Sequence, residues 1–298
     1  MKKFLSPDST KISRPAGATS QADAVPPKFT NGSPLPLIKD MEAIVGEANV
    51  HGRLSDLVRF SSDAGPYRSI PQIVVSPRSA QDLAALMRYC HNNGRHMTFR
   101  AAGTSLNGQA MSDDILVDIK RHFSGMEIRD GGTKLWSRPG VILGDAQAVL
   151  GRHGFMLGPD PGSTSVCTIG GVLADNSGGM RCSLERDSYH CVEELVFVLP
   201  SGTIVDTARG DAAFKAQEPE LHANLLAFRD RLRADEKMVQ FLRKKFSIRN
   251  TNGLRIDAFL DEDEPVHILK RLMVGSEGIF GAIVESVMKT VKLPTVKA

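Results

Sequence analysis

A glycine- and hydroxyl-rich loop that directly follows a predicted strand constrains this chain more than any other feature. Residues 97–99 alternate apolar and polar side chains, and Arg-Ala-Ala-Gly-Thr-Ser-Leu-Asn-Gly-Gln follows over residues 100–109. Gly103 and Gly108 permit close approach of the backbone, and the Thr and Ser between them add hydroxyl donors beside backbone N–H groups that can form an anion nest. The loop predicts a phosphate site, with a glycine-rich surface turn as the alternative interpretation.

The residues around this loop argue against two common nucleotide motifs. The spacing of Gly103 and Gly108 imitates a nucleoside triphosphate loop, but Gln109 and Ala110 stand where that loop has Lys and then Ser or Thr. Without these residues there is neither a cation for terminal phosphates nor a hydroxyl ligand for magnesium, so a phosphate-binding hydrolase is a weak interpretation. The loop also lacks the Gly-x-Gly-x-x-Gly of a dinucleotide-binding doubly wound fold.

Composition predicts a soluble, cytoplasmic globular protein. The 298 residues are 41% hydrophobic, enough for a large core in one or two domains, and the 37 basic and 34 acidic residues are interspersed without the footprint of a nucleic-acid partner. There is no apolar run near the roughly 20 residues of a membrane span and no secretory h-region. No Cys-x-x-Cys pair or metal-ligand spacing occurs, so we expect reduced thiols and no metal site at Cys90, Cys167, Cys182 and Cys191.

Proline and hydrophobic patterns divide the chain into three parts. Residues 1–36 contain scattered prolines among small polar residues and predict a flexible amino-terminal arm, and residues 37–65 predict a helical lead-in. A compact domain is expected over 66–294, with subdomains at about 66–125 and 126–294. The first subdomain should hold a small parallel or mixed sheet, from strands at 73–75, 97–99 and 115–119 and a helix at 79–91.

The second subdomain reads as a larger set of strands and helices. Its hydrophobic pattern predicts short strands at 126–128 and 134–136, a helix at 143–153, a hairpin of 193–199 with 203–207, helical structure over 211–246 and a final strand at 282–291.

A second glycine-rich segment, residues 158–179, is poorly suited to a core and well suited to a flat ligand. Two prolines stiffen its start, and the pairs Gly170-Gly171 and Gly178-Gly179 permit close approach of the backbone. Between these pairs, residues 168–174 can begin a short helix whose N-terminus faces an anion.

Three segments in order resemble the FAD-binding domain of the vanillyl-alcohol oxidase and p-cresol methylhydroxylase (PCMH-type) superfamily. They are residues 100–109, residues 160–179 and the Gly-Ser-Glu-Gly-Ile-Phe-Gly of residues 275–281. The sequence is most similar to bacterial FAD-linked D-lactate and D-2-hydroxyglutarate dehydrogenases, with further support from residues 250–260. This resemblance spans about 66–291 and implies an α+β fold of two α/β subdomains, a small mixed sheet followed by a larger, mainly antiparallel sheet with helices.

The resemblance implies FAD as the cofactor and assigns residues to its site. Binding should be non-covalent, because Thr104 and Ser105 stand where some relatives have histidine. For Glu277 a turn-capping role is the alternative. The implied cofactor-binding residues are Ala102, Gly103, Thr104, Ser105, Gly108, Gln109, Asp160, Pro161, Ser163, Thr168, Ile169, Gly170, Gly171, Ala174, Asn176, Gly178, Gly179, Glu277 and Gly278.

The implied activity is that of an FAD-dependent oxidoreductase acting on a D-2-hydroxy acid such as D-lactate or D-2-hydroxyglutarate. Electrons would leave to a quinone, a cytochrome or an iron-sulfur acceptor, and this acceptor offers a route to peripheral membrane association. Related dehydrogenases carry a histidine-rich substrate domain after the FAD domain, which we expect to be absent before Ala298. The sequence identifies no catalytic base, so a non-catalytic FAD-binding module, or a truncated subunit that needs a separate substrate domain, is the alternative.

Overall fold

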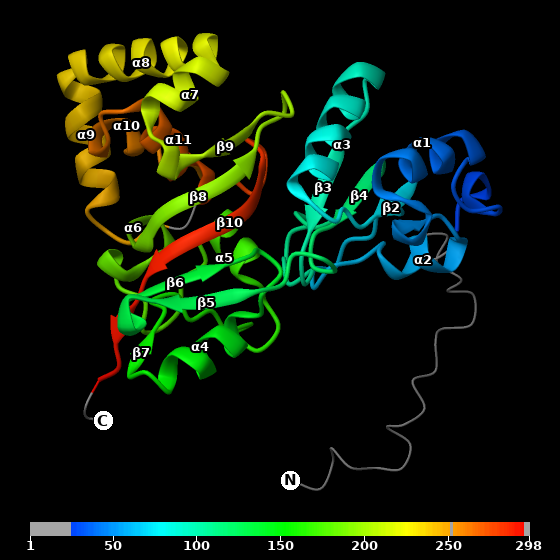
Figure 1. The fold of residues 1–298 in the computed structure, drawn as a ribbon, viewed down its shortest axis with the longest axis horizontal. Coiled ribbons are helices and arrows are strands. Elements are labelled where there is room, and N and C mark those ends of the chain that lie inside the picture. The colour runs from blue at the N-terminus through cyan, green and yellow to red at the C-terminus, as the bar shows by residue number, and fades with distance from the viewer. Residues whose placement is uncertain (1–24, 251–252, 295–298) are drawn as a thin grey trace, which may run out of the picture.

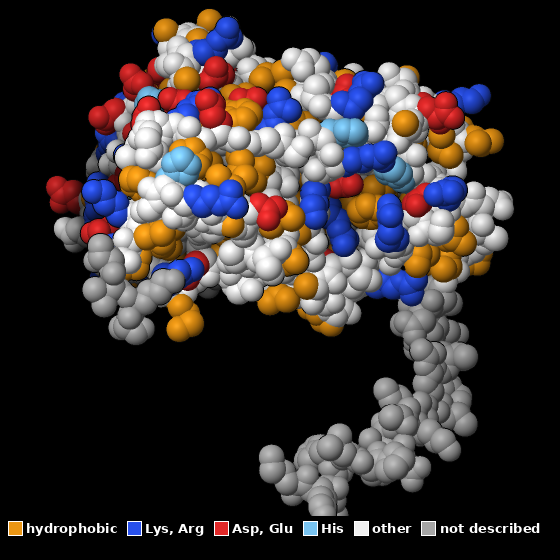
Figure 2. All heavy atoms as spheres, turned by 60° about the horizontal axis from the view of Figure 1, so that its bottom comes forward, with side chains coloured by type: hydrophobic (Ala, Val, Ile, Leu, Met, Phe, Trp, Pro, Cys, Tyr) orange, Lys and Arg blue, Asp and Glu red, His pale blue; other side chains and the backbone are white. Residues whose placement is uncertain are grey.

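The computed structural model describes residues 25–250 and 253–294, which form two α/β units side by side (Figure 1). One unit is built on a four-stranded mixed sheet and the other on a five-stranded antiparallel sheet, as the predicted α+β class requires. Most of the predicted arm lies outside the described residues. On the face shown in Figure 2, basic and acidic side chains are interspersed with apolar ones.

The small sheet has the strand order β1-β2-β4-β3, in which β2, β4 and β3 are parallel and β1 is antiparallel. Both of its faces are covered, because alternate residues of the central strands pack into separate apolar clusters on the two sides. The region expected as a helical lead-in contributes to this unit, since α1 and β1 pack into it. The bounds are β1 Val50–His51, β2 Ile73–Val75, β3 Met97–Arg100 and β4 Ile115–Asp118, with α1 Leu35–Val45, α2 Leu54–Arg59 and α3 Ala80–Asn93.

The predicted helix after β2 begins and ends as its sequence indicates. The Ser79 side chain accepts a hydrogen bond from the Asp82 N–H, which caps the first turn of α3, and Gly94 ends the helix in the left-handed region at φ +59°. The buried face includes the predicted residues Leu83, Leu86 and Cys90.

The larger sheet has the order β5-β6-β10-β8-β9, and every neighbouring pair is antiparallel. The predicted final strand is divided, since β10 ends at Lys289 and β11 then pairs with β7 in a separate two-stranded sheet. The strands are β5 Met126–Arg129, β6 Lys134–Ser137, β7 Phe155–Met156, β8 Val192–Val198, β9 Ile204–Asp206, β10 Ala282–Lys289 and β11 Val291–Lys292.

Helices α7 to α11 lie toward β8 and β9 and α4 lies toward β5, at the two ends of the sheet (Figure 1), and residues of α4 and α11 pack into one buried cluster with the strands. The predicted helical stretch 211–246 is three helices, because Pro219 begins α8 and Asp235 caps α9 by accepting a hydrogen bond from the Met238 N–H. The bounds are α4 Leu143–Gly151, α5 Ile169–Asp175, α6 Ser188–Cys191, α7 Asp211–Gln217, α8 Pro219–Ala234, α9 Glu236–Phe246, α10 Ala258–Asp261 and α11 Pro265–Met273.

The two units share an apolar boundary. Val198 of β8 and Ala282 and Val284 of β10 belong to the same buried cluster as the residues of the small sheet. The loop after β3, the segment leading into α5 and the turn before β10 therefore converge where the two sheets meet.

Candidate functional site

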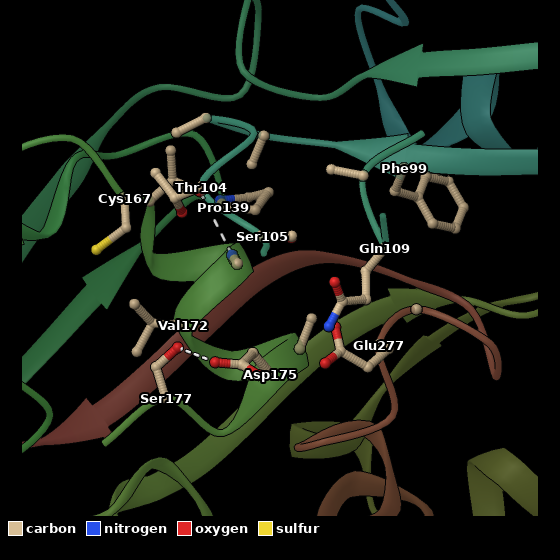
Figure 3. A pocket seen from close by; sticks show the side chains of 18 of the residues that line it. Phe99, Thr104, Ser105, Gln109, Pro139, Cys167, Val172, Asp175, Ser177 and Glu277 are labelled. Atoms are coloured by element: carbon tan, nitrogen blue, oxygen red, sulfur yellow. Dashed lines mark hydrogen bonds between the residues drawn. The ribbon is translucent and has the colours of Figure 1, made fainter. Parts of the chain in front are cut away.

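A cavity of about 430 Å³ lies where these three glycine-rich segments converge (Figure 3). A more open hollow of about 860 Å³ adjoins it and shares lining residues such as Gln109, Gly178 and Glu277. The two together suit an extended ligand, and the enclosed part has the size of ordinary ligand sites.

Most of the predicted site residues line this space. The lining contains Ala102, Gly103, Thr104, Ser105, Gln109, Pro161, Ser163, Thr168, Gly170, Gly171, Ala174, Gly178, Glu277 and Gly278, and the adjoining hollow adds Asp160 and Gly179. Gly108, Ile169 and Asn176 line neither part. Ile169 and Asn176 are only 1% and 2% exposed and lie behind the wall of the cavity, by which we mean the lining residues of 160–179 and 276–278. We therefore expect no direct contact from either side chain to a ligand. The individual contacts to a bound molecule remain predictions.

The loop after β3 offers backbone donors to an anion. Within the described chain, the N–H groups of Gly103, Thr104 and Ser105 donate no hydrogen bond to another residue. Gly103 has φ +69°, a left-handed conformation that turns the loop, and a Cβ there would lie 2.6 Å from the Arg100 guanidinium. That guanidinium donates to the Ser62 carbonyl oxygen at 2.7 Å, which fixes the start of the loop.

The N-terminus of α5 does not share this role, contrary to the sequence-based expectation. Thr168 caps the helix, but the N–H groups of Ile169 and Gly170 each donate at 2.9 Å to carbonyl oxygens of the protein, those of Val141 and Pro139. Since these groups are already paired, the N–H donors that the site leaves open to an anion are those of the loop after β3.

The glycines of the second segment are required for different reasons. A Cβ on Gly170 would lie 2.4 Å from Pro139, and one on Gly179 would lie 2.1 Å from the Asp160 backbone oxygen, so the protein itself fills that space. A Cβ on Gly171 would meet only Thr168 Oγ1, at 3.7 Å, and Gly162 has nothing within 4 Å. Gly162 and Gly171 are therefore the glycines that leave room for a ligand.

Asp160 holds the wall in place through several hydrogen bonds. Its carboxylate accepts from the backbone N–H groups of Arg181 and Cys182 at 3.1 Å and from the Arg181 guanidinium at 2.9 Å. These bonds join the two ends of the second glycine-rich segment, which makes Asp160 a positioning residue at the rim of the cavity.

Glu277 points into the cavity from the turn before β10, where Figure 3 shows it beside Gln109 and Asp175. Its backbone is in the left-handed region at φ +53°, and its N–H donates to the Ala174 carbonyl oxygen at 2.8 Å. Its carboxyl interacts with the Asp175 and Gln109 side chains.

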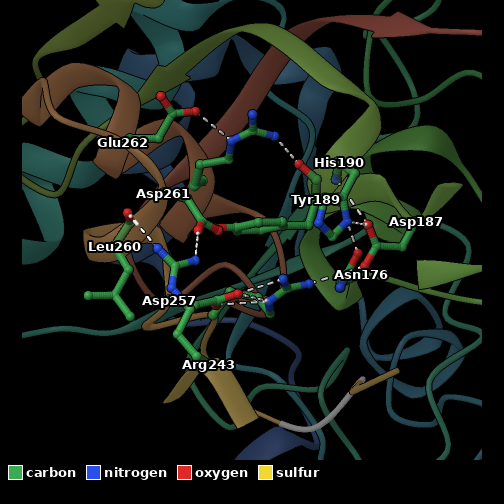
Figure 4. A network of polar contacts seen from close by, with 11 residues as sticks. Asn176, Asp187, Tyr189, His190, Arg243, Asp257, Leu260, Asp261 and Glu262 are labelled. Atoms are coloured by element: carbon green, nitrogen blue, oxygen red, sulfur yellow. Dashed lines mark hydrogen bonds and ion pairs between the residues drawn. The ribbon is translucent and has the colours of Figure 1, made fainter. Parts of the chain in front are cut away.

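A buried ionic network lies behind this wall, and sequence reasoning missed it (Figure 4). Arg255, only 3% exposed, donates to Asp187 at 3.1 Å and to Asp257 at 2.7 Å, and its guanidinium stacks 3.7 Å from the Tyr189 ring centroid. Asp187 also caps α6. Arg255, which lies in the segment that supported the resemblance, thus braces the wall.

Two further observations concern residues 25–250 and 253–294, a possible membrane span and a possible metal site. No helix there combines the length and the apolar composition needed to cross a lipid bilayer. No three His, Cys, Asp or Glu side chains gather there closely enough to hold a metal ion.

Comparison with known proteins agrees with this geometry. Residues 71–208 match the family model described as FAD binding domain. D-2-hydroxyglutarate dehydrogenase of Haemophilus influenzae is 24% identical over 277 residues, covering 87% of this chain and 26% of the relative. The glycolate oxidase subunit GlcD of Escherichia coli is 34% identical over 131 residues, or 43% of this chain and 26% of the relative. This chain thus spans about a quarter of these relatives.

Solved structures show the same fold. Alkyldihydroxyacetonephosphate synthase aligns with TM-score 0.60 at 16% identity, covering 92% of this chain and 43% of that one. Glucooligosaccharide oxidase from Acremonium strictum aligns with TM-score 0.56 at 14% identity, covering 86% and 43%. The unpaired loop donors and the open faces of Gly162 and Gly171 fit a dinucleotide such as FAD. Residues 71–208 therefore form an FAD binding domain with the fold of these solved structures, and FAD is its cofactor.

Proposed function

We propose that this chain supplies the FAD-binding domain of an oxidoreductase acting on a D-2-hydroxy acid such as D-lactate or D-2-hydroxyglutarate. The observation that carries the proposal is the cavity itself, in which unpaired loop N–H groups and ligand-facing glycines converge from separate segments. The names of relatives such as D-2-hydroxyglutarate dehydrogenase and the mitochondrial D-lactate dehydrogenase of Saccharomyces cerevisiae support the substrate class.

The residues of the cavity would bind and orient FAD, which when bound supplies the acceptor for the substrate's hydride. The N–H groups of residues 103–105 would satisfy the negative charge of the pyrophosphate without a lysine. Buried apolar residues such as Val172 exclude water from one side. We assign no catalytic base to this chain. The proposed FAD-binding domain is the one expected from sequence, residues 66–294 with subdomains at about 66–125 and 126–294.

We propose that FAD binds without a covalent bond. Within the described lining of both hollows there is no histidine, and Cys167 is the sole cysteine. That thiol is only 5% exposed, and burial raises its pKa, which disfavours the nucleophilic thiolate. Acid denaturation should release all flavin into the supernatant, whereas flavin retained on the precipitated chain would contradict this proposal.

The acceptor of electrons is proposed to be a quinone, a cytochrome or an iron-sulfur protein, in a cytoplasmic setting with association at a membrane through that acceptor. A non-catalytic FAD-binding module that works with a separate substrate domain is the second candidate.

Anaerobic mixing of the FAD-loaded chain with each hydroxy acid separates the two candidates. Bleaching of the visible flavin absorbance by D-lactate or D-2-hydroxyglutarate, and not by the L-enantiomers, is expected for a self-sufficient enzyme. Stable absorbance in a chain that holds FAD would instead identify the module that needs a partner.

A further inference from the structure

Two carboxyl groups from different elements meet in the wall of the cofactor cavity. Asp175 ends α5 and Glu277 belongs to the turn before β10, yet their side chains lie within hydrogen-bonding reach of one another. Ser177 donates to the Asp175 carboxylate, and the Gln109 side chain contacts Glu277 from the opposite loop. The bond from the Glu277 N–H to Ala174 O fixes the two carboxyls on one short stretch of the wall (Figure 3).

This arrangement makes ionisation of both groups unfavourable. Burial, followed by the negative charge of Asp175 and its hydrogen bond, raises the pKa of Glu277 to about 7, against a smaller opposing effect of Gln109. Two carboxyls at such close range hold one proton between them, so the titration belongs to the pair. At neutral pH the free protein is therefore divided between the singly protonated and the fully ionised pair.

The surrounding charges leave this pair uncompensated. The loop at 101–110 that faces it carries no ionisable side chain. In the adjoining hollow, Asp160 is ion-paired with Arg181, and the Arg249 guanidinium donates to the Gly179 carbonyl oxygen at 2.8 Å. None of these groups appears among the causes of the Glu277 shift, which are burial, Asp175 and Gln109.

We propose that FAD binding is coupled to the uptake of one proton by the Asp175–Glu277 pair. This rests on FAD lying in the cavity as proposed above. The pyrophosphate brings about two negative charges near a pair that already carries at least one, and the ligand displaces water, so both effects favour the protonated pair. The proton comes from solvent, and no bond to the cofactor forms.

The coupling fixes the sign of the pH dependence. Below pH about 7 the free pair already holds its proton and takes up no further one on binding. The pair should therefore cause no change of FAD affinity with pH in that range. Above that value each bound FAD takes up a proton, and affinity should fall up to about tenfold per pH unit until the pKa of the complex is reached.

Calorimetric titration of the full FAD-free chain with FAD tests the coupling directly. At about pH 8, titrations in two buffers with different ionisation enthalpies should report close to one proton taken up per FAD, since most free pairs are ionised at that pH. Glu277→Gln should take up almost none and bind FAD with an affinity that is nearly independent of pH. Asp175→Asn removes the charge that raises the Glu277 pKa and should move the uptake to lower pH. Glu194→Gln should behave as the unaltered chain.

Each contrary result has a distinct meaning. FAD binding by the unaltered chain without proton uptake between about pH 7 and 9 would overturn the proposal, and so would uptake that persists in Glu277→Gln. A chain that binds no FAD at any pH would overturn the cofactor site, and this proposal with it. Failure of a hydroxy acid to bleach bound FAD would count against the proposed activity alone and would leave the coupling standing.

Discussion

The cofactor cavity and the Arg255 network lie on opposite sides of the same wall, and they differ in whether their polar groups have partners within the protein. In the cavity, the N–H groups at 103–105 have no partner in the described chain. In the network, Arg255, Asp187 and Asp257 are all at least nine-tenths buried and fully engaged with one another. Unpaired donors provide binding capacity and paired ions provide a fixed scaffold, so mutations in the two regions should separate affinity from stability.

The largest expected effect comes from breaking the network. Arg255→Met leaves Asp187 and Asp257 buried without their cation and should lower the free energy of unfolding by about 3–5 kcal/mol. Urea unfolding followed by circular dichroism measures this loss. Arg243→Met, which breaks an exposed pair with Asp261, should cost less than about 1 kcal/mol. Equal losses in the two variants would contradict the distinction between buried and exposed pairs.

Two adjacent glycines sharpen the comparison within the wall. Gly170→Ala places a Cβ against Pro139 and should cost about 1–3 kcal/mol of stability. Gly171→Ala places its Cβ in the open cavity, so stability should hold or rise by up to about 1 kcal/mol while FAD affinity falls. Thermal melts and FAD titrations of both variants give the two quantities. An unchanged affinity in Gly171→Ala would place the ligand elsewhere.

Acid should reduce the stability contributed by the Arg255 network, whereas the loop at 101–110 has no ionisable side chain to respond. Burial alone would raise the pKa of Asp187, but hydrogen bonds from His190 and the charges of His190 and Arg255 outweigh burial and lower it. Because the pKa of Asp187 is lower in the folded than in the unfolded chain, its ionised form stabilises the fold at pH values above the unfolded pKa near about 4. This stabilisation is lost as the pH falls toward and through the folded-state pKa, at up to about 1.4 kcal/mol per pH unit. Urea titrations should show a shallower acid dependence in Asp187→Asn. An identical slope would remove Asp187 from the acid response.

The smallest effect concerns the four cysteines, all of which are buried. Burial raises the pKa of Cys90 and of Cys191 to about 11 and also raises those of Cys167 and Cys182. Native protein at neutral pH should therefore react with a thiol reagent far more slowly than the denatured chain. Rapid labelling of Cys167 in native protein would contradict the closed wall beside the cavity.

Local patterns predicted the strands, the helix α3 and the glycine-rich segments, because each of these is encoded within a few consecutive residues. The network escaped prediction because Asp187 and Arg255 are 68 positions apart and meet only in the fold. The contact of Asp175 with Glu277 was not predicted either, because these residues are also far apart in the sequence. The N-terminus of α5 was misjudged because its partners, Pro139 and Val141, come from a distant turn. Sequence identified the segments of the wall, and the fold determined which of their groups stay unpaired.

FAD binding in the cavity between the loop after β3 and α5 is the central claim, and one titration tests it most directly. The purified, FAD-free chain would be titrated with FAD while flavin fluorescence is followed, alongside Gly171→Ala. The account predicts saturation at one FAD per chain and clearly weaker binding by a variant that remains as stable as the unaltered chain. A folded chain that takes up no FAD, or a variant that binds it equally well, would contradict the account.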